Sequence, residues 1–325
     1  MIRHLLTALL LIVSSLASAR IGLDSQLTHE ALEAAGLTGE AAPEGFSVES
    51  EEYGGLLFAL SGTGTHEPSS LAAIATAVGI ATGMGEGIAE PVGGFLDDNL
   101  ESLTGAGEAM IGIESSYHLV LDVTEDSLSW GLRLVEIDEE LFLPARNFLG
   151  AEDATIIIRE FADFQCPHCA TFALQGLPMV KSELLDADNI RFEFHHLPLV
   201  SIHANAVPAA EAAECVAQTN GPGAFWDFSH HVFERQQAWN NLPETAGYFI
   251  SLAQETGFDD TGLSECLSER TFLAEITDSA VHATSVLGIT GTPTVFLGGF
   301  RVPNWSSPAA YHELIDLITA REAAE

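Results

Sequence analysis

The sequence CPHC at residues 166–169 constrains the fold most, because it stands at a junction between two kinds of local pattern. Before it, ATIIIREF at 154–161 is a β-branched apolar run of the kind found in buried strands. After it, ATFALQGLPMVKSELL has the apolar spacing of a helix. We therefore expect Cys166 to begin a helix that directly follows a buried strand.

A cysteine at the start of a helix lies beside unpaired backbone N–H groups and the positive end of the helix dipole, and both favour a thiolate. His168 adds a second donor or a positive charge next to it. These effects lower the pKa of the Cys166 thiol and stabilise the reduced form. A disulfide between Cys166 and Cys169 is therefore expected to be a strong oxidant that passes readily to another protein.

Two other interpretations of the CPHC spacing are half of a zinc site and an inert structural bridge. Zinc needs two further ligands, but Cys215 and Cys266 are single and distant, and the adjacent His195 and His196 point to opposite faces of a strand. A bridge across two residues closes a ring too small to constrain the unfolded chain much. We therefore expect redox chemistry, with no metal and no prosthetic cofactor.

The chain begins MIRHLLTALLLIVSSLASA, with a positive start, an apolar run and small residues up to Ala19. This pattern predicts a cleaved secretory signal peptide over residues 1–19; the alternative is a retained N-terminal anchor. The mature protein is then extracytoplasmic, in the periplasm or cell envelope or secreted, where disulfides persist.

The chain is strongly acidic, with 47 acidic and 11 basic residues and a formal charge of -36. Such a surface repels nucleic acids and anionic membranes, which excludes both as partners. Residues 20–149 alone hold 23 acids and 3 arginines. The acidity is that of a solvated surface that keeps the protein soluble; adaptation to a salty or alkaline habitat is the alternative.

The sequence pattern changes near residue 148, which predicts two domains. Residues 20–148 are expected to form a small α+β domain without cysteine or catalytic groups. Its predicted elements are a helix at 28–36, a strand at 53–60, a buried helix at 68–85 and a hairpin with strands at 119–123 and 128–134. The segment 68–85 is marginal in length for a membrane span, and its glycines and hydroxyls favour the buried helix.

Residues 149–325 are expected to form an α/β domain. Its predicted elements are strands at 154–161 and 190–199, a helical insertion at about 200–287, two short strands around Gly298-Gly299 and a final helix with Pro308 in its first turn.

Four stretches of this second domain resemble the DsbA type of thioredoxin-like disulfide oxidoreductases. They are EFADFQCPHC, FEFHHLPL followed by HANAVPAAEAAECVAQ, GAFWDFSHHVF and GITGTPTVFLGG, and they follow the family's order over about 149–320. The resemblance implies a thioredoxin fold with an inserted helical subdomain. The N-terminal domain resembles no family.

The resemblance also implies roles for single residues of the CPHC motif. Cys166 is the attacking cysteine, Cys169 is the resolving cysteine, and Pro167 and His168 set the redox poise.

Further roles follow from the same resemblance for Thr292, Pro293 and Glu160. Pro293 is the cis-proline opposite the disulfide, and Thr292 offers backbone groups to an extended substrate segment; the alternative is a trans proline at a strand entrance. Glu160 is a buried acid that moves the Cys169 proton; the alternative is a surface acid on an edge strand.

Cys215 and Cys266 lie in the helical insertion. In an oxidising compartment, with an even cysteine count, they are expected to bridge each other as a structural disulfide. The alternative is a second redox pair. Four aromatic residues of the insertion are expected to form its core rather than a peptide-binding groove: Phe225, Trp226, Phe228 and Phe233.

The function implied is the donation of disulfides to exported substrate proteins that carry thiols, with a membrane redox partner that reoxidises the CPHC pair. One alternative is a disulfide isomerase or reductase dimerised through the N-terminal domain. A second alternative is a non-enzymatic binding or chaperone module in which the CPHC motif is incidental.

Overall fold

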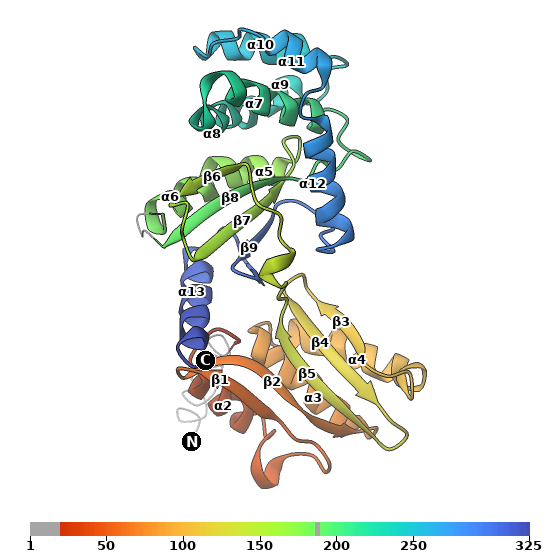
Figure 1. Ribbon diagram of the computed structural model, residues 1–325. Coiled ribbons are helices and arrows are strands. Elements are labelled where there is room, and N and C mark those ends of the chain that lie inside the picture. The colour runs from red at the N-terminus through yellow and green to blue at the C-terminus, as the bar shows by residue number, and fades with distance from the viewer. Residues whose placement is uncertain (1–19, 186–188) are drawn as a thin grey trace, which may run out of the picture. The chain divides into compact units, whose positions relative to one another are not determined.

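The computed structural model describes residues 20–185 and 189–325, and the predicted signal peptide at 1–19 lies outside the described residues. Two compact units are present: one extends to Val135 and includes His312–Glu325, and the other is Glu136–Tyr311 (Figure 1).

This division differs from the predicted boundary at residue 148. The segment after Val135 folds with the second unit for two reasons. Its residues 147–150 pair as a strand with residues 191–194 of that unit, and Ile137 N–H donates to the carbonyl of Gly299 at 2.8 Å. The chain's last residues join the first unit, where Glu313 accepts a hydrogen bond from Arg20 at 2.6 Å.

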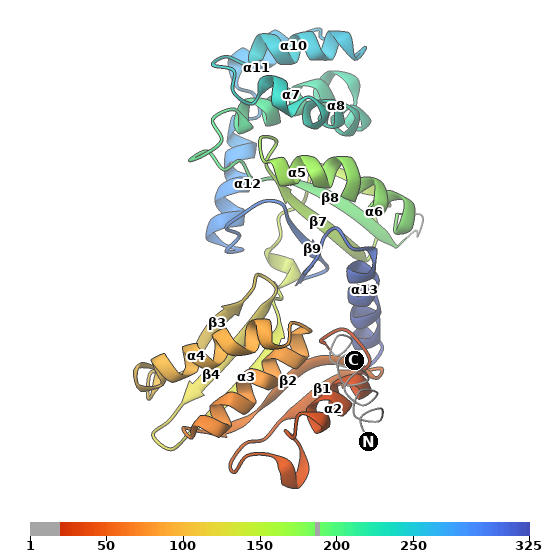
Figure 2. The same cartoon turned by 180° about the vertical axis from the view of Figure 1, so that it is seen from behind.

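The first unit is an antiparallel sheet with the strand order β1-β2-β5-β4-β3. Its strands are β1 (Glu49–Tyr53), β2 (Leu56–Thr65), β3 (Ala109–Ile113), β4 (Tyr117–Val123) and β5 (Ser127–Leu134). Its helices are α2 (Ser25–Ala34), α3 (Pro68–Thr82) and α4 (Glu86–Leu103), and α3 and α4 lie across one face of the sheet (Figure 2). The predicted α+β class and the β4–β5 hairpin are confirmed.

The buried helix predicted at 68–85 is confirmed as α3, which ends before Gly83 with its φ of 71°. In the described residues no helix is long and apolar enough to span a bilayer.

Two local predictions for the first unit were wrong. The single strand predicted at 53–60 is split by a turn at Gly54 and Gly55, whose φ values of 59° and 83° suit glycine. The helix predicted from residue 28 begins at Ser25, because the side chain of Asp24 caps it by accepting from Gln26 N–H at 2.9 Å.

The second unit is built on a mixed sheet with the order β10-β9-β7-β8-β6, in which only β7 and β8 are parallel. Its strands are β6 (Asn147–Gly150), β7 (Ile156–Ala162), β8 (Ile190–His196), β9 (Thr294–Leu297) and β10 (Phe300–Arg301). The strands predicted in this region are confirmed, and β6 is an additional edge strand.

Helices cover this sheet and extend beyond it. Between β7 and β8 lie α5 (Pro167–Thr171), a π-helical turn (Phe172–Gly176) and α6 (Leu177–Glu183). The insertion between β8 and β9 contains α7 (Ala206–Asn220), α8 (Pro222–Glu234), α9 (Gln236–Trp239), α10 (Ala246–Glu255), α11 (Leu263–Glu269) and α12 (Leu273–Ser285), and α13 (Pro308–Glu322) closes the chain. The expected thioredoxin fold with an inserted helical subdomain is confirmed.

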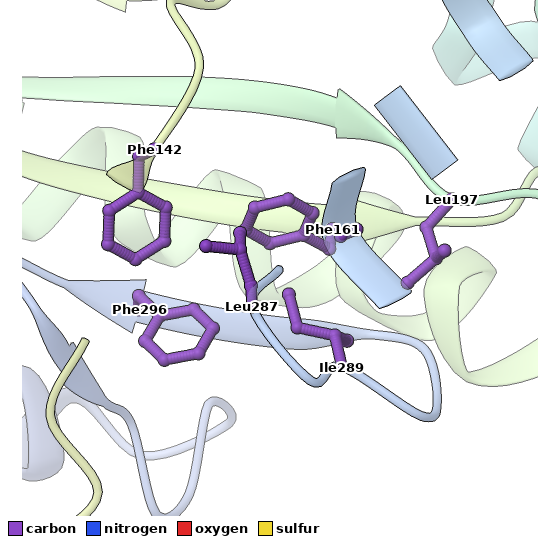
Figure 3. Packing of buried hydrophobic residues seen from close by; sticks show 7 residues of the cluster. Phe142, Phe161, Leu197, Leu287, Ile289 and Phe296 are labelled. Carbon is purple, nitrogen blue, oxygen red and sulfur yellow. The ribbon is translucent and has the colours of Figure 1, made fainter. Parts of the chain in front are cut away.

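The core of the second unit fixes which way β7 faces. Phe161 of β7 packs with Phe142, Phe296 and Ile289 on one face of the sheet (Figure 3). Neighbouring residues on a strand point to opposite faces, so Glu160 points to the other face. On that other face Phe164 stacks on Phe233 of α8 with ring centroids 4.7 Å apart.

The four aromatic residues of the insertion, Phe225, Trp226, Phe228 and Phe233, are all buried, so their prediction as core residues is confirmed.

Candidate active site

Cys166 is the N-cap residue of α5, directly after the loop that leaves β7, and only 5% of it is exposed. Its Sγ donates to the carbonyl oxygen of Thr292 at 3.4 Å. The peptide bond between Thr292 and Pro293 is cis, and both residues are half-buried just before β9. Local sequence therefore places the cysteine at a helix start, and the long-range pairing of β7 with β9 brings Thr292 to it.

The pKa of the Cys166 thiol is lowered to about 5. The largest cause is its hydrogen bond with Cys169; burial opposes this, and Thr292 and the backbone N–H groups of Cys169 and His168 add to the lowering. The group of Thr292 that lowers this pKa is its side-chain hydroxyl, which is buried, has no other hydrogen-bond partner among the described residues and can therefore donate to the thiolate. The thiolate is thus held by donors at the helix start.

Cys169 has the opposite environment. It is fully buried, and burial, the contact with Cys166 and the nearby Glu160 together raise the pKa of its thiol well above the ordinary value. Asp163 N–H donates to its Sγ at 3.4 Å. At neutral pH the reduced pair is therefore a thiolate at Cys166 and a thiol at Cys169.

We predict that Cys166 in the reduced protein titrates with a midpoint near pH 5. Because the pKa of Cys166 is lower in the folded protein than in the unfolded chain, the thiolate stabilises the fold. This stabilisation is fully present above the ordinary thiol pKa of the unfolded chain and is lost as the pH falls through about 5. Alkylation by iodoacetamide, followed against pH and mapped by peptide mass, measures this midpoint. An alkylation midpoint near the unperturbed value of about 8.5 would contradict it.

Glu160 lies on β7 beneath the two cysteines and is 1% exposed. Burial, and then the charge of Cys166, raise the pKa of its carboxyl well above the ordinary value. Its Oε1 has no hydrogen-bond partner among the described residues, and Glu160 is one of the residues that line a pocket of about 150 Å³. Exposed Lys181 and His230 also line this pocket, which therefore links the buried carboxyl to the surface.

Pro167 and His168 are exposed on α5, next to the buried cysteines. The His168 backbone N–H contributes to the low pKa of Cys166. The structure thus brings together all seven residues predicted for the redox site: Glu160, Cys166, Pro167, His168, Cys169, Thr292 and Pro293.

Sequence reasoning missed the polar residues that hold the loop before Cys166. The Asp163 carboxylate is buried and accepts from Gln165 N–H at 2.6 Å, from Leu199 N–H at 2.7 Å and from His203 Nδ1 at 2.7 Å. His203, a single histidine outside any motif, is a direct partner of the loop. The one local feature of the sequence that could have indicated this interaction is Asp163 itself, an acidic residue three positions before Cys166.

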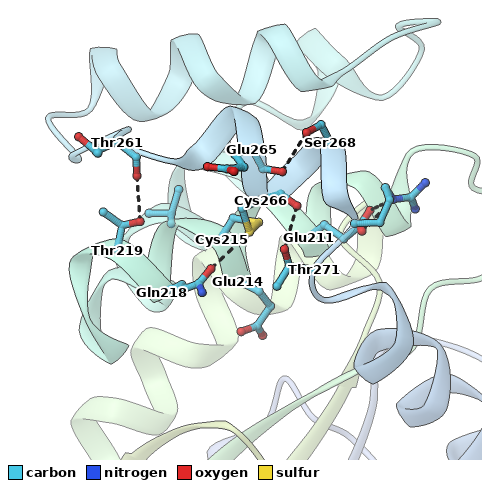
Figure 4. The surroundings of a disulfide bond; sticks show 12 residues. Glu211, Glu214, Cys215, Gln218, Thr219, Thr261, Glu265, Cys266, Ser268 and Thr271 are labelled. Carbon is cyan, nitrogen blue, oxygen red and sulfur yellow. Dashed lines mark hydrogen bonds and ion pairs between the residues drawn. A yellow bond between two sulfur atoms is a disulfide. The ribbon is translucent and has the colours of Figure 1, made fainter.

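The structure joins Cys215 of α7 and Cys266 of α11 in a disulfide with a Cα–Cα distance of 6.0 Å (Figure 4). Both cysteines are buried within the helical insertion. Neither helix carries a CPHC residue. Across residues 20–185 and 189–325, no group of His, Cys, Asp or Glu side chains is arranged to hold a metal ion.

A Thioredoxin family model matches residues 144–317, more than half of the chain. The disulfide bond formation protein D of Bacillus subtilis is 28% identical over 172 residues, which are 52% of this chain and 74% of that protein. The Na(+)/H(+) antiporter NhaA 3 of Salinispora tropica is 32% identical over 152 residues, 47% of this chain. The chain spans 21% of the length of that antiporter.

Among solved structures, oxidised BdbD of Bacillus subtilis is similar, with 26% identity and a TM-score of 0.45. The similarity covers 54% of this chain and 90% of BdbD.

Proposed function

The chain belongs to the Thioredoxin family, and from that premise we propose that it is an extracytoplasmic thiol–disulfide oxidoreductase that donates disulfides to exported proteins. The observation that carries the proposal is the opposite environment of its two thiols. The Cys166 thiolate is stabilised by surrounding donors, while burial keeps Cys169 protonated. A pair whose reduced form is stabilised in this way is a strong oxidant.

The reaction begins with the Cys166–Cys169 disulfide. A substrate thiolate attacks Sγ of Cys166, the bond to Cys169 breaks, and the electron pair stays on the Cys169 sulfur, which takes up a proton. A mixed disulfide now joins the substrate to Cys166. The second substrate thiolate attacks the substrate sulfur of this bond and releases Cys166 as a thiolate. The substrate loses two electrons, and the CPHC pair gains them.

Thr292 and Pro293 form the surface beside the attacked sulfur. The carbonyl of Thr292 lies 3.4 Å from Cys166 Sγ. An extended substrate segment that forms backbone hydrogen bonds with Thr292 therefore places its own cysteine next to that sulfur. Backbone hydrogen bonds of this kind recognise an extended chain without selecting its side chains. Substrates are therefore proteins with exposed thiols in unfolded or loop segments.

Glu160 supplies the proton that Cys169 takes up. Its raised pKa favours the protonated carboxyl, and the pocket that Glu160 lines is the route by which this proton is replaced from the surface.

We predict that Glu160→Gln slows formation of the mixed disulfide by about 100-fold at pH 7, because the amide keeps the shape of the side chain but transfers no proton. Stopped-flow mixing of the oxidised protein with a thiol peptide measures this rate. The matched control is Glu193→Gln, a buried carboxylate on β8 that is bonded to His195 and away from the cysteines. Equal rates for the wild type and Glu160→Gln would remove Glu160 from the mechanism.

The extracytoplasmic location is supported by the composition of residues 1–19 and by the disulfide in the insertion, since such bonds persist in oxidising compartments. A membrane redox partner then reoxidises the CPHC pair after each turnover. No prosthetic group takes part in this cycle.

The α+β unit that precedes the redox domain favours a second candidate, a disulfide isomerase or reductase that dimerises through this unit. The proposal treats this α+β unit, residues 20–135 together with 312–325, as dispensable for electron transfer.

Three assays run side by side separate these functions: oxidative refolding of a reduced protein, reactivation of scrambled ribonuclease and reduction of insulin. The proposal expects the oxidative refolding rate to exceed the other two. A higher isomerase or reductase rate would favour the second candidate, and inactivity in all three would favour a non-enzymatic binding module.

A further inference from the structure

The loop of residues 163–166 carries Cys166 and is held by the helical insertion at several points. Asn205 N–H donates to Gln165 Oε1 at 2.7 Å, and Gln165 Nε2 donates in turn to the carbonyl of Asn240 at 2.7 Å. Asn205 Nδ2 donates to the carbonyl of Leu242 at 2.9 Å. These bonds connect the loop to the start of α7 and to the chain directly after α9, the short helix that contains Gln236.

Gln236 makes the contact closest to the reactive cysteine. Its side-chain Nε2 donates to the carbonyl of Phe164 at 2.8 Å and to the carbonyl of Cys166 at 3.0 Å. Gln236 is 4% exposed and Phe164 is 1% exposed, so neither bond is easily replaced by water. One amide group thus fixes two carbonyls of the turn from β7 into α5.

We propose that Gln236 is a positioning residue for Cys166, whose side-chain amide holds the loop so that the Cys166 sulfur stays against Thr292 and Cys169. The inference rests on the proposed function and assigns the insertion a part in it. Gln236 touches neither sulfur. It acts through the backbone of Cys166, whose carbonyl also accepts from Ala170 N–H at 3.1 Å in the first turn of α5.

Loss of the two hydrogen bonds from the Gln236 amide is expected to change the stability of the Cys166 thiolate. The thiolate is held by short-range contacts with Cys169, with the side-chain hydroxyl of Thr292 and with the backbone N–H groups at the helix start. Hydrogen bonds weaken steeply as distance and angle depart from their optimum, so a small displacement of the loop weakens several of these contacts together. The reduced form then loses stabilisation, and the disulfide becomes a weaker oxidant.

The test compares three variants with the wild-type protein. Gln236→Met keeps the length of the side chain and removes both donors. Gln236→Asn keeps an amide but is one methylene too short to reach both carbonyls, and it serves if the methionine variant fails to fold. The matched control is Asn220→Leu, because Asn220 Nδ2 also donates to two carbonyls, of Val216 at 3.0 Å and Asp259 at 2.9 Å, elsewhere in the insertion.

We expect Gln236→Met and Gln236→Asn to raise the midpoint of the Cys166 thiolate titration, followed by absorbance at 240 nm, by about one pH unit. The equilibrium constant with glutathione should change about tenfold, which corresponds to a fall in reduction potential of about 30 mV. Asn220→Leu should lower the melting temperature and leave both quantities at wild-type values.

An unchanged midpoint and potential in the Gln236 variants would overturn the inference, even if their melting temperatures fall, because that is the result of a purely structural role. The same shift in Asn220→Leu would overturn it too. The wild-type potential in this experiment tests the proposed function separately, since a reducing wild-type couple would contradict that function whatever the variants do.

Discussion

Replacing Cys166 with serine is expected to reduce the rate of disulfide transfer by at least about 1,000-fold, because the residue that forms the covalent intermediate is lost. A serine hydroxyl stays protonated where the Cys166 thiol, with its pKa of about 5, is already a thiolate. It also forms no disulfide with Cys169. The refolding rate of a reduced substrate protein, measured with catalytic amounts of each variant, reports the loss.

Cys169→Ser is the informative partner of this variant. Cys166 remains a reactive thiolate, but the resolving sulfur is absent, so substrates should accumulate as mixed disulfides on Cys166. Non-reducing gel electrophoresis and mass spectrometry detect these adducts. Adducts on Cys169 in the Cys166→Ser variant, at the level seen for Cys169→Ser, would reverse the two roles and contradict the buried, high-pKa position of Cys169.

Removing the second disulfide is expected to have the largest effect on stability. Cys215 and Cys266 are separated by 51 residues, and closing a loop of this length contributes up to about 4 kcal/mol in the chain-entropy model. The double variant Cys215→Ala/Cys266→Ala should therefore lose a large part of its free energy of unfolding. Urea denaturation measures this loss from the shift of the transition midpoint.

The control for this variant is Cys166→Ala/Cys169→Ala, which should unfold at nearly the urea concentration of the oxidised wild type, in which Cys166 is not a thiolate. The disulfide variant should keep the Cys166 titration midpoint of the wild type, because the bridge joins α7 to α11, whereas the partners of the Cys166 sulfur are Cys169, Thr292 and His168. Loss of oxidase activity without loss of stability would identify Cys215 and Cys266 as a second redox pair instead.

The redox site could be predicted from the sequence because the patterns that indicate it are local. Cys166 and Cys169 share one helical turn, the strand before them is strongly apolar, and Thr292-Pro293 precedes a second apolar strand. These patterns need no knowledge of tertiary contacts. The resemblance to a known family then supplied roles that spacing alone does not define, and the Thioredoxin family match confirms that resemblance.

The residues that hold the loop of the site in place could not be predicted from the sequence, because their hydrogen-bond partners are distant along the chain. Gln236 bonds to Cys166 across 70 residues, and His203 bonds to Asp163 across 40. No periodicity links such pairs, and a buried glutamine in a four-residue helix looks like any polar loop residue. Their function depends on where the insertion packs, which only the folded chain defines.

Some elements escaped prediction for local reasons. Helix α4 contains Pro91, Gly93 and Gly94, residues with poor helix propensity, and it forms because its apolar side chains Val92 and Leu96 are buried. The edge strand β6 has only four residues and no alternating pattern long enough to detect.

The reduction potential of the Cys166–Cys169 couple tests the central claim most directly. It is measured by equilibrating the protein with glutathione buffers at pH 7 and trapping the free thiols. A stabilised Cys166 thiolate predicts an oxidising couple, closer to about -120 mV than to about -270 mV. A value near about -270 mV would show that the site is built to reduce disulfides, and it would contradict the proposed donation of disulfides to exported proteins.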